Sequence, residues 1–595
     1  MKRLILSRLW MLISIIILTT GQAWAKTPPT SQKVFNSIKD LRDAAAGNTL
    51  SDVVIQFEST NPATVVAVMT KHDPDITEDE KFINSFFIVN KGDDDSYYGL
   101  WVSPNDIKDN YKLPTDLAIG STFTGLIIGD YSEGTSGIPY FGSIHASKTI
   151  EGTNYSTKFN IVHSGEASGT TPAVYPVTVV KDVNTIANNN PKDGNTATAS
   201  YGKYLNTIIK VPGTIKKASD KDNNTEFYLV QDENTGTSKD DMSNRIYFNS
   251  SQLDGINLND YVGTSGTFEG ILVKRNQSES KLIVLKGDFF KVNKIYLDEN
   301  DEEGRVEYLA SQGAFDGEVK VYVHRTKLVS NEGAWNTICL PFDLTKDEFY
   351  NAFGCTLTAL AKPTTSDESA HQWAGQVSDK GVLSFTKQTD LTIKAGVPYL
   401  MQASGKQTAC LKTIPGSENM EPEELKNADG NYYASVGNKT ITVNAPYEVK
   451  ASYIDNIVNG DFYFRGLYGR KKYVDGSTTT LIADGGSQKY QYISTATGSY
   501  LKYLPSGSTL QFNGMRAYFY FPRWNAENNK AAASQNNNTN AKIHVAVMAA
   551  STTGISNISA EEASKQAEVY NLSGQRVDAS YKGIVVRNGR KFLRK

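Results

Sequence analysis

Phe86-Phe87-Ile88-Val89 and Thr122-Phe123-Thr124-Gly125, 36 positions apart, return later in the chain as Phe227-Tyr228-Leu229-Val230 and Thr267-Phe268-Glu269-Gly270, 40 positions apart. Such short apolar runs with β-branched and aromatic residues, bounded by turn residues, are typical of β-strands. Each block holds about five of these runs, with a long connection before the fourth, which suits a small Greek-key barrel. The ordered recurrence predicts a tandem repeat of one domain type. Chance agreement between two unrelated β domains is the alternative.

The two blocks also set the expected domain boundaries. The Asn188-Asn189-Asn190-Pro191 run predicts a linker between the two blocks. The acidic stretch from Asp298 to Glu303 marks the next boundary, and later strand-like runs predict a β-rich domain, in sandwich form. We therefore expect a mainly β protein with two tandem barrels, a larger sandwich-type domain and a small β tail. The expected parts are a signal peptide (1–25), a disordered lead-in (26–33), barrel domains (34–180 and 191–294), the sandwich-type domain (296–549) and the tail (551–595).

One helix is marked clearly inside the sandwich-type domain. Thr345 can cap its start, Glu348 follows three residues later, and Leu344 can pack on Phe349. Gly354 is placed to end the helix.

The first residues have the order of a secretory signal peptide. Lys2, Arg3 and Arg8 precede an apolar run from 9 to 18, and Ala23-Trp24-Ala25 stands directly before Lys26. This order predicts cleavage between Ala25 and Lys26. The apolar run is about half of the ~20 residues that span a bilayer, so a retained anchor is the weaker alternative. No later run is long and apolar enough to span a membrane. Together with the C-terminal tail described below, the signal peptide predicts an extracellular or outer-membrane surface location.

Composition and charge narrow the possible functions. The chain has 61 Lys and Arg residues against 64 Asp and Glu residues, a net charge of −3, which argues against strong general attraction to nucleic acid or to anionic membranes. It has three cysteines, Cys339, Cys355 and Cys410, which could form at most one pair. We interpret them as buried apolar thiols, since free cysteine is among the most buried residue types.

Motifs for catalysis or metal binding are missing from the sequence. The six histidines have no HxH, HxxxH or HExxH spacing, and there is no GxSxG elbow or Walker loop. Asp93-Asp94-Asp95 and the stretch from Asp298 to Glu303 could offer oxygens to calcium, but solvated charged turns are the favoured interpretation. The sequence therefore predicts no catalytic residue, no metal ligand and no cofactor.

Five aromatic residues are the candidate binding residues. Aromatic faces on a barrel can stack on sugars or on single-stranded bases. Between Val34 and Tyr175 there are 19 Asp and Glu residues against 9 Lys and Arg residues, and this acidic balance disfavours nucleic acid. The alternative is that these rings fill the barrels. The candidates are Tyr97, Tyr98 and Trp101 in the first block, and Tyr228 and Tyr247 in the second.

Three segments resemble known families. The Phe227 to Asp232 strand and the Leu258 to Gly270 stretch resemble OB-like domains of secreted Bacteroidota proteins. The segments 335–342, 396–399 and 515–519 look like a domain that recurs in the same group and mostly lacks an assigned activity. Val569 to Val577 with Gly583 to Val586 is similar to the end of type IX secretion sorting domains. That resemblance implies that the tail directs export and either surface attachment or release.

These expectations combine into a function. We expect an exported, surface-displayed, non-enzymatic binding or spacer protein, adhesin-like, with a glycan or host matrix as possible ligand and the export machinery as partner of the tail. The first alternative is a secreted polysaccharide hydrolase with catalytic carboxylates in 296–549. The second alternative is an OB-type nucleic-acid binder.

Overall fold

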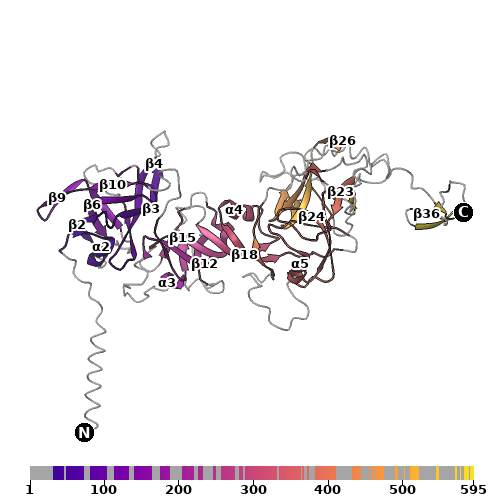
Figure 1. The fold of residues 1–595 in the computed structure, drawn as a ribbon, viewed down its shortest axis with the longest axis horizontal. Coiled ribbons are helices and arrows are strands. Elements are labelled where there is room, and N and C mark those ends of the chain that lie inside the picture. Colours follow the sequence, from indigo (N-terminus) through magenta and orange to yellow (C-terminus); the bar gives the residue numbers. More distant parts are fainter. Residues whose placement is uncertain are drawn as a thin grey trace, which may run out of the picture. The chain divides into compact units, whose positions relative to one another are not determined.

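The protein is mainly β, as the sequence predicts, in the computed structural model shown in Figure 1. The predicted signal peptide and its predicted cleavage site lie outside the residues that the structure describes. Those residues are 31–45, 48–72, 81–103, 113–114, 116–132, 140–163, 175–187, 204–219, 225–231, 245–248, 256–274, 280–285, 289–330, 334–363, 365–367, 372–373, 382–410, 432–443, 453–454, 459–460, 463–474, 490–493, 501–502, 509–521, 544–548, 570–571, 577, 582–587 and 590–594.

The first block forms a closed barrel. β3 pairs with β4, β4 with β5, β5 with β7 in parallel, β7 with β6, and β6 again with β3, so five strands complete a circuit. Helix α2 packs Ile38, Leu41 and Ala45 into the same apolar core as Phe86 and Phe123. The elements are β1 (Val34–Phe35), α2 (Ile38–Ala45), β2 (Leu50–Phe57), β3 (Ala63–His72), β4 (Lys81–Lys91), β5 (Tyr97–Val102), β6 (Thr122–Ser132), β7 (Tyr140–His145), β8 (Ser147–Ile150), β9 (Thr153–Ser156) and β10 (Lys158–Val162).

The second block repeats this circuit. β12 pairs with β13, β13 with β14, β14 with β16 in parallel, β16 with β15, and β15 with β12. Each block opens with a short strand parallel to its first long strand and ends with a strand antiparallel to its fourth barrel strand. The elements are β11 (Val177–Val179), α3 (Asn184–Ala187), β12 (Ile208–Ser219), β13 (Thr225–Val230), β14 (Arg245–Phe248), η5 (Leu258–Tyr261), β15 (Ser265–Lys274), β16 (Ser280–Ile283) and β17 (Phe290–Asp298).

The two barrels belong to one compact unit and share an apolar interface. Phe87 and Trp101 are cross-strand partners on the first barrel, and their rings stack with centroids 6.0 Å apart and planes 10° apart. Phe87 joins a buried cluster that also contains Ile208, Ile271 and Ile283 of the second barrel, and Trp101 packs against it. The barrels are therefore packed together through the strands that carry three of the candidate aromatic residues.

This first unit extends beyond the expected boundary near residue 295. It contains the described residues up to Tyr296 together with Glu307–Lys320, whereas Leu297–Val306 and the residues from Val321 belong to a second unit. The returning segment bonds to the second barrel, because the Asn257 backbone N–H donates to Tyr308 Oη at 2.6 Å. Lys291 Nζ donates to the Gly313 carbonyl at 2.7 Å. The elements here are α4 (Arg305–Ser311) and β18 (Phe315–His324).

The second unit contains two sheets that pack face to face. The five-stranded sheet has the order β19-β24-β20-β23-β34, and the four-stranded sheet β28-β33-β30-β31. The centroid of the Phe385 ring in the first sheet lies 5.5 Å from that of Phe464 and 6.2 Å from that of Phe519, both in the second sheet. The elements are β19 (Asn336–Ile338), α5 (Lys346–Phe353), β20 (Thr356–Pro363), β21 (Thr365–Asp367), β22 (Gln372–Trp373), β23 (Val382–Lys387), β24 (Tyr399–Ser404), β25 (Ala434–Thr440), β26 (Tyr453–Ile454), β27 (Asn459–Gly460), β28 (Tyr463–Leu467), β29 (Lys471–Val474), β30 (Tyr490–Ile493), β31 (Leu501–Lys502), β32 (Thr509–Phe512), β33 (Arg516–Tyr520) and β34 (His544–Met548).

Helix α5 confirms the predicted capping signals. The Glu348 backbone N–H donates to Thr345 Oγ1 at 3.3 Å, and the Thr345 backbone N–H donates to the Glu348 carboxylate at 2.9 Å. Gly354 ends the helix with a φ of 74°, in the left-handed region that favours glycine.

The tail contains a small sheet in the order β35-β36-β37. Its strands are β35 (Tyr570–Asn571), β36 (Gly583–Arg587) and β37 (Arg590–Arg594). The last two strands are antiparallel neighbours that form a hairpin, in which Arg587 pairs with Arg590. Among the described residues, no helix has the length and apolar character needed to cross a membrane.

Candidate functional site

The candidate aromatic residues are used for packing. Tyr97 and Trp101 lie against the apolar interface between the barrels. Tyr98 packs on the core of the first barrel and donates its hydroxyl to Asp94 at 3.0 Å. Tyr228 and Tyr247 are each 4% exposed. The described packing of these five rings therefore agrees with the alternative that they fill or join the barrels.

The second barrel repeats the ring pair of the first. Tyr228 and Tyr247 are cross-strand partners with ring centroids 6.2 Å apart, at the strands that correspond to those of Phe87 and Trp101. The Arg245 guanidinium lies 4.6 Å from the Tyr228 ring centroid, a cation–π distance. With both rings buried, stacking on a sugar or a base would require this surface to open.

Each carboxylate of the acidic turn at Asp93–Asp95 contacts a different side chain. Lys39 Nζ lies 3.1 Å from Asp93, the Tyr98 hydroxyl bonds to Asp94, and Lys91 Nζ lies 3.4 Å from Asp95. The three carboxylates therefore do not converge. Within the part of the chain that the structure describes, no group of three His, Cys, Asp or Glu side chains could hold a metal ion.

A Ser–His–Asp chain of contacts occurs in the first barrel. Ser121 Oγ lies 3.2 Å from His163 Nδ1, and His163 Nε2 lies 3.3 Å from Asp116 Oδ2. A hydrolytic triad needs a nucleophile that the substrate can reach and a buried acid. Here the exposure is reversed, because Ser121 is fully buried and the Asp116 side chain is 60% exposed. We conclude that this chain of contacts supports the loop around Ser121 rather than nucleophilic attack.

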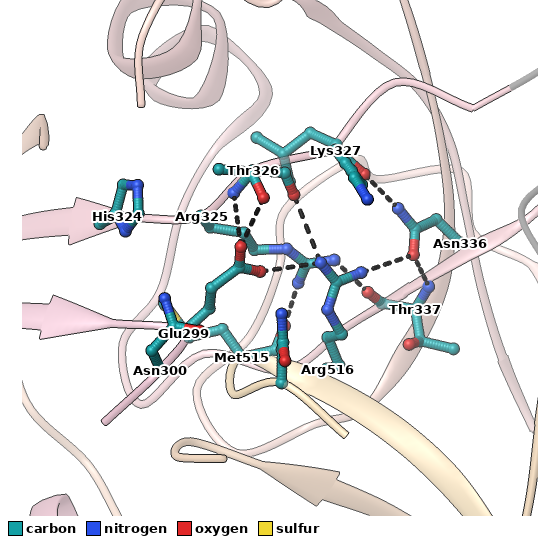
Figure 2. Close-up of polar contacts among 12 residues, drawn as sticks. Glu299, Asn300, His324, Arg325, Thr326, Lys327, Asn336, Thr337, Met515 and Arg516 are labelled. Atoms are coloured by element: carbon teal, nitrogen blue, oxygen red, sulfur yellow. Dashed lines mark hydrogen bonds and ion pairs between the residues drawn. The ribbon is translucent and has the colours of Figure 1, made fainter. Parts of the chain in front are cut away.

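Among the residues that the structure describes, buried charged side chains are concentrated at one place in the second unit (Figure 2). We call it the polar cluster, and it consists of Asp298, Glu299, His324, Arg325 and Arg516. Its members come from the end of β17 and the residue after it, from the end of β18 and the residue after it, and from the start of β33. Segments far apart in the sequence thus meet at one point inside the unit.

Glu299 is the central acid of the polar cluster. It is 2% exposed, and its Oε2 accepts from Arg516 Nη2 at 2.8 Å. Its Oε1 accepts from both the backbone N–H and the hydroxyl of Thr326. Burial alone would raise the pKa of Glu299, but Arg516 and the Thr326 hydroxyl lower it below its usual range. Glu299 is therefore a fixed anion.

Arg325 is the most deeply buried cation, with no exposed surface. Its Nη2 donates to the Thr337 carbonyl at 2.6 Å, and its Nη1 donates to the Met515 carbonyl. Nε has no hydrogen-bond partner among the residues that the structure describes. Burial and repulsion by Arg516 lower the pKa of Arg325, while the Glu299 carboxylate opposes this effect. The charges of Arg325 and Arg516 are thus both balanced by the Glu299 carboxylate.

His324 and Asp298 form a second pair beside Glu299. His324 Nδ1 lies 3.0 Å from Asp298 Oδ2, and the Tyr433 hydroxyl donates to the same oxygen at 3.1 Å. Burial would lower the pKa of His324, but the bond to Asp298 and the nearby carboxylates raise it overall. Burial would raise the pKa of Asp298, but His324 and the Asn300 backbone lower it overall. Both shifts favour an ion pair.

Two further acids of this stretch, Asp301 and Glu303, are also paired. Asp301 lies 2.6 Å from Arg305, and Glu303 pairs with Lys471. The expectation of a solvated charged turn is therefore wrong for Asp298 and Glu299, which are buried. The local sequence has no signal for this, because Arg516 lies 217 residues from Glu299.

The three cysteines are buried free thiols, as predicted. Burial raises the pKa of Cys355 to about 11 and that of Cys410 to about 12. Since the thiolate is the nucleophilic form, these shifts disfavour cysteine chemistry.

No protein-family model matches this chain, and the search of curated proteins found no significant match.

Proposed function

We propose that this chain is an exported, surface-displayed protein without catalytic activity, in which two OB-like barrels act as a spacer for the second unit. The observation that carries this proposal is the apolar interface between the barrels, which contains Phe87 and Ile271. Domains joined by such an interface hold one orientation better than domains joined by a flexible linker alone. A spacer needs this property.

The close approach at Gly99 supports the same role. A Cβ atom at Gly99 would lie 2.1 Å from the backbone carbonyl oxygen of Asn206, so the two barrels meet without room for a side chain. The aromatic candidates Tyr97 and Trp101 are packed at the same interface. The geometry therefore favours a spacer role over stacking on a ligand for this surface.

The polar cluster favours a non-enzymatic second unit over a polysaccharide hydrolase. A glycosidase needs one carboxylic acid with a raised pKa and a second carboxylate, both facing the sugar. Asp298 and Glu299 have lowered pKa values and bind His324 and Arg516. This pair of acids is thus suited to holding segments together, and a glycan or matrix ligand would bind without bond cleavage.

The export part of the proposal is supported by the sequence of residues 1–25 and 551–595. The test is fractionation of producing cells that express the full chain or a chain that ends at residue 550. A matched control carries a shuffled 551–595 segment of the same composition. We expect the full chain to be accessible to added protease on intact cells, and the other two chains to be protected. Surface exposure of the truncated chain would contradict the sorting role.

A further inference from the structure

The hairpin β36–β37 has one apolar pair that faces outward. Ile584 and Leu593 are cross-strand partners, and they are 43% and 67% exposed. The neighbouring Val585 is 4% exposed, as expected where successive side chains alternate between two faces of a strand. The hairpin is therefore two-faced, with an aliphatic pair left in contact with water.

The same segment is strongly basic. Residues 576–595 contain seven Lys and Arg residues and one acidic residue, whereas the rest of the chain has 54 Lys and Arg residues against 63 Asp and Glu residues. The positive charge is thus concentrated in the stretch of sequence that contains Ile584 and Leu593. The basic residues are Arg576, Lys582, Arg587, Arg590, Lys591, Arg594 and Lys595.

We propose that the β36–β37 hairpin docks on the surface of an anionic lipid bilayer. Basic segments are attracted to anionic headgroups, and exposed aliphatic side chains beside them can enter the interfacial layer. The combination argues for a lipid surface over a purely polar polyanion, because a polar polyanion would give Ile584 and Leu593 no apolar environment. The cationic charge is complementary to the anionic headgroups, and the apolar pair favours a bilayer over a polar polyanion.

This contact extends the proposed function by giving the displayed chain a means of staying at a membrane surface. It rests on the proposed function only for the compartment in which the contact would occur. Binding to vesicles can be measured with purified protein, so that a failure of the export proposal and a failure of this one remain distinguishable.

The test is flotation of the purified full chain with vesicles of phosphatidylcholine containing 30% phosphatidylglycerol, and with vesicles of phosphatidylcholine alone. We expect binding to the anionic vesicles at low salt, little binding to neutral vesicles, and loss of binding at 1 M salt, where the Debye length is about 3 Å. The triple variant Arg587→Gln, Arg590→Gln, Lys591→Gln should bind about 100-fold more weakly, since each cation contributes roughly a fivefold factor near such a surface.

The apolar pair is tested by the double variant Ile584→Ser, Leu593→Ser. We expect binding about tenfold or more weaker, because two exposed aliphatic side chains no longer enter the interface. The matched control is Val162→Ser, Val179→Ser, at positions that are 63% and 75% exposed in the first unit, and it should bind like the parent. Circular dichroism checks that each variant keeps its fold.

Three outcomes would overturn the proposal. The first is equal binding to neutral and anionic vesicles. The second is unchanged binding of the Ile584→Ser, Leu593→Ser variant, which would indicate a general polyanion contact. The third is retention on immobilised polyglutamate without binding to anionic vesicles, which would point to an acidic protein partner instead.

Discussion

Replacing Glu299 by glutamine should destabilise the second unit far more than its single lost charge suggests. The amide is close to isosteric, but it places a neutral group against Arg516 and near Arg325, which has no exposed surface. One end of the amide is also a donor, and it faces either the Thr326 donors or the Arg516 donor. Removing one partner of a buried ion pair typically costs about 3–5 kcal/mol. Because a domain is stable by only about 5–15 kcal/mol, this is a large share of the total.

The assay is hydrogen exchange read by mass spectrometry at the level of peptides. We expect the free energy of opening to fall by about 3–5 kcal/mol in peptides from β18 and β33, with no change in peptides from β4 and β12 of the first unit. A matched control is Asp343→Asn, which removes an ion pair with Lys394 whose side chains are 54% and 55% exposed. An exposed pair contributes about 0–1 kcal/mol, so the control should change little.

A double-mutant cycle with Arg516→Gln isolates the pair. If Glu299 and Arg516 stabilise each other, the double variant should be less destabilised than the sum of the single variants, with a coupling of about 0.5–3 kcal/mol. A Glu299→Gln variant no less stable than Asp343→Asn would refute the view that the polar cluster holds the second unit together.

Three further predictions concern other features. The stability that the His324–Asp298 ion pair gives through His324 is fully present below the ordinary histidine pKa of 6.5, and it is lost as pH rises through the raised pKa of His324. The stability that it gives through Asp298 is lost only at the acid end, as pH falls below 3.8 through the lowered pKa of Asp298. The melting temperature of the second unit should therefore fall above pH 6.5 in the parent, and a His324→Gln variant should lack this decline; an unchanged decline would exclude His324 as its source. Gly99→Ala should lower the melting temperature of the first unit and shift Trp101 fluorescence to the red, because the new Cβ meets the Asn206 carbonyl. The control Gly152→Ala has no neighbour within 4 Å, so its melting temperature should fall only by the backbone strain of an alanine at a φ of +82°. Thr345→Ala should cost about 1 kcal/mol in guanidinium denaturation by removing the cap of α5, and a loss near zero would show that the cap contributes little.

Features with local causes could be predicted from the sequence. The strand runs of both blocks are set by alternating apolar residues and turn residues, and the paired elements indeed follow the same order in each block. The α5 cap depends only on Thr345, Glu348 and Gly354, which lie within ten positions. The buried thiols follow from the general preference of free cysteine.

Features that depend on distant partners could not be predicted. Nothing near Glu299 indicates Arg516, and the acidic turn therefore read as solvated. Strand alternation placed Tyr97 and Trp101 on a barrel, but it could not show that one outer face of this barrel meets Ile208 and Ile271 of the next. The return of Glu307–Lys320 to the first unit could not be predicted from the sequence either, because it depends on tertiary contacts with Asn257 and Lys291.

That return segment constrains the order in which the protein can mature during synthesis. The first barrel has all of its strands once β10 has formed, by Val162. The second barrel has its strands by Asp298, but its bonds to Tyr308 and Gly313 must wait for later residues. A chain that emerges from its N-terminus would thus keep the Asn257 region without its final hydrogen bond while the first residues of the second unit appear.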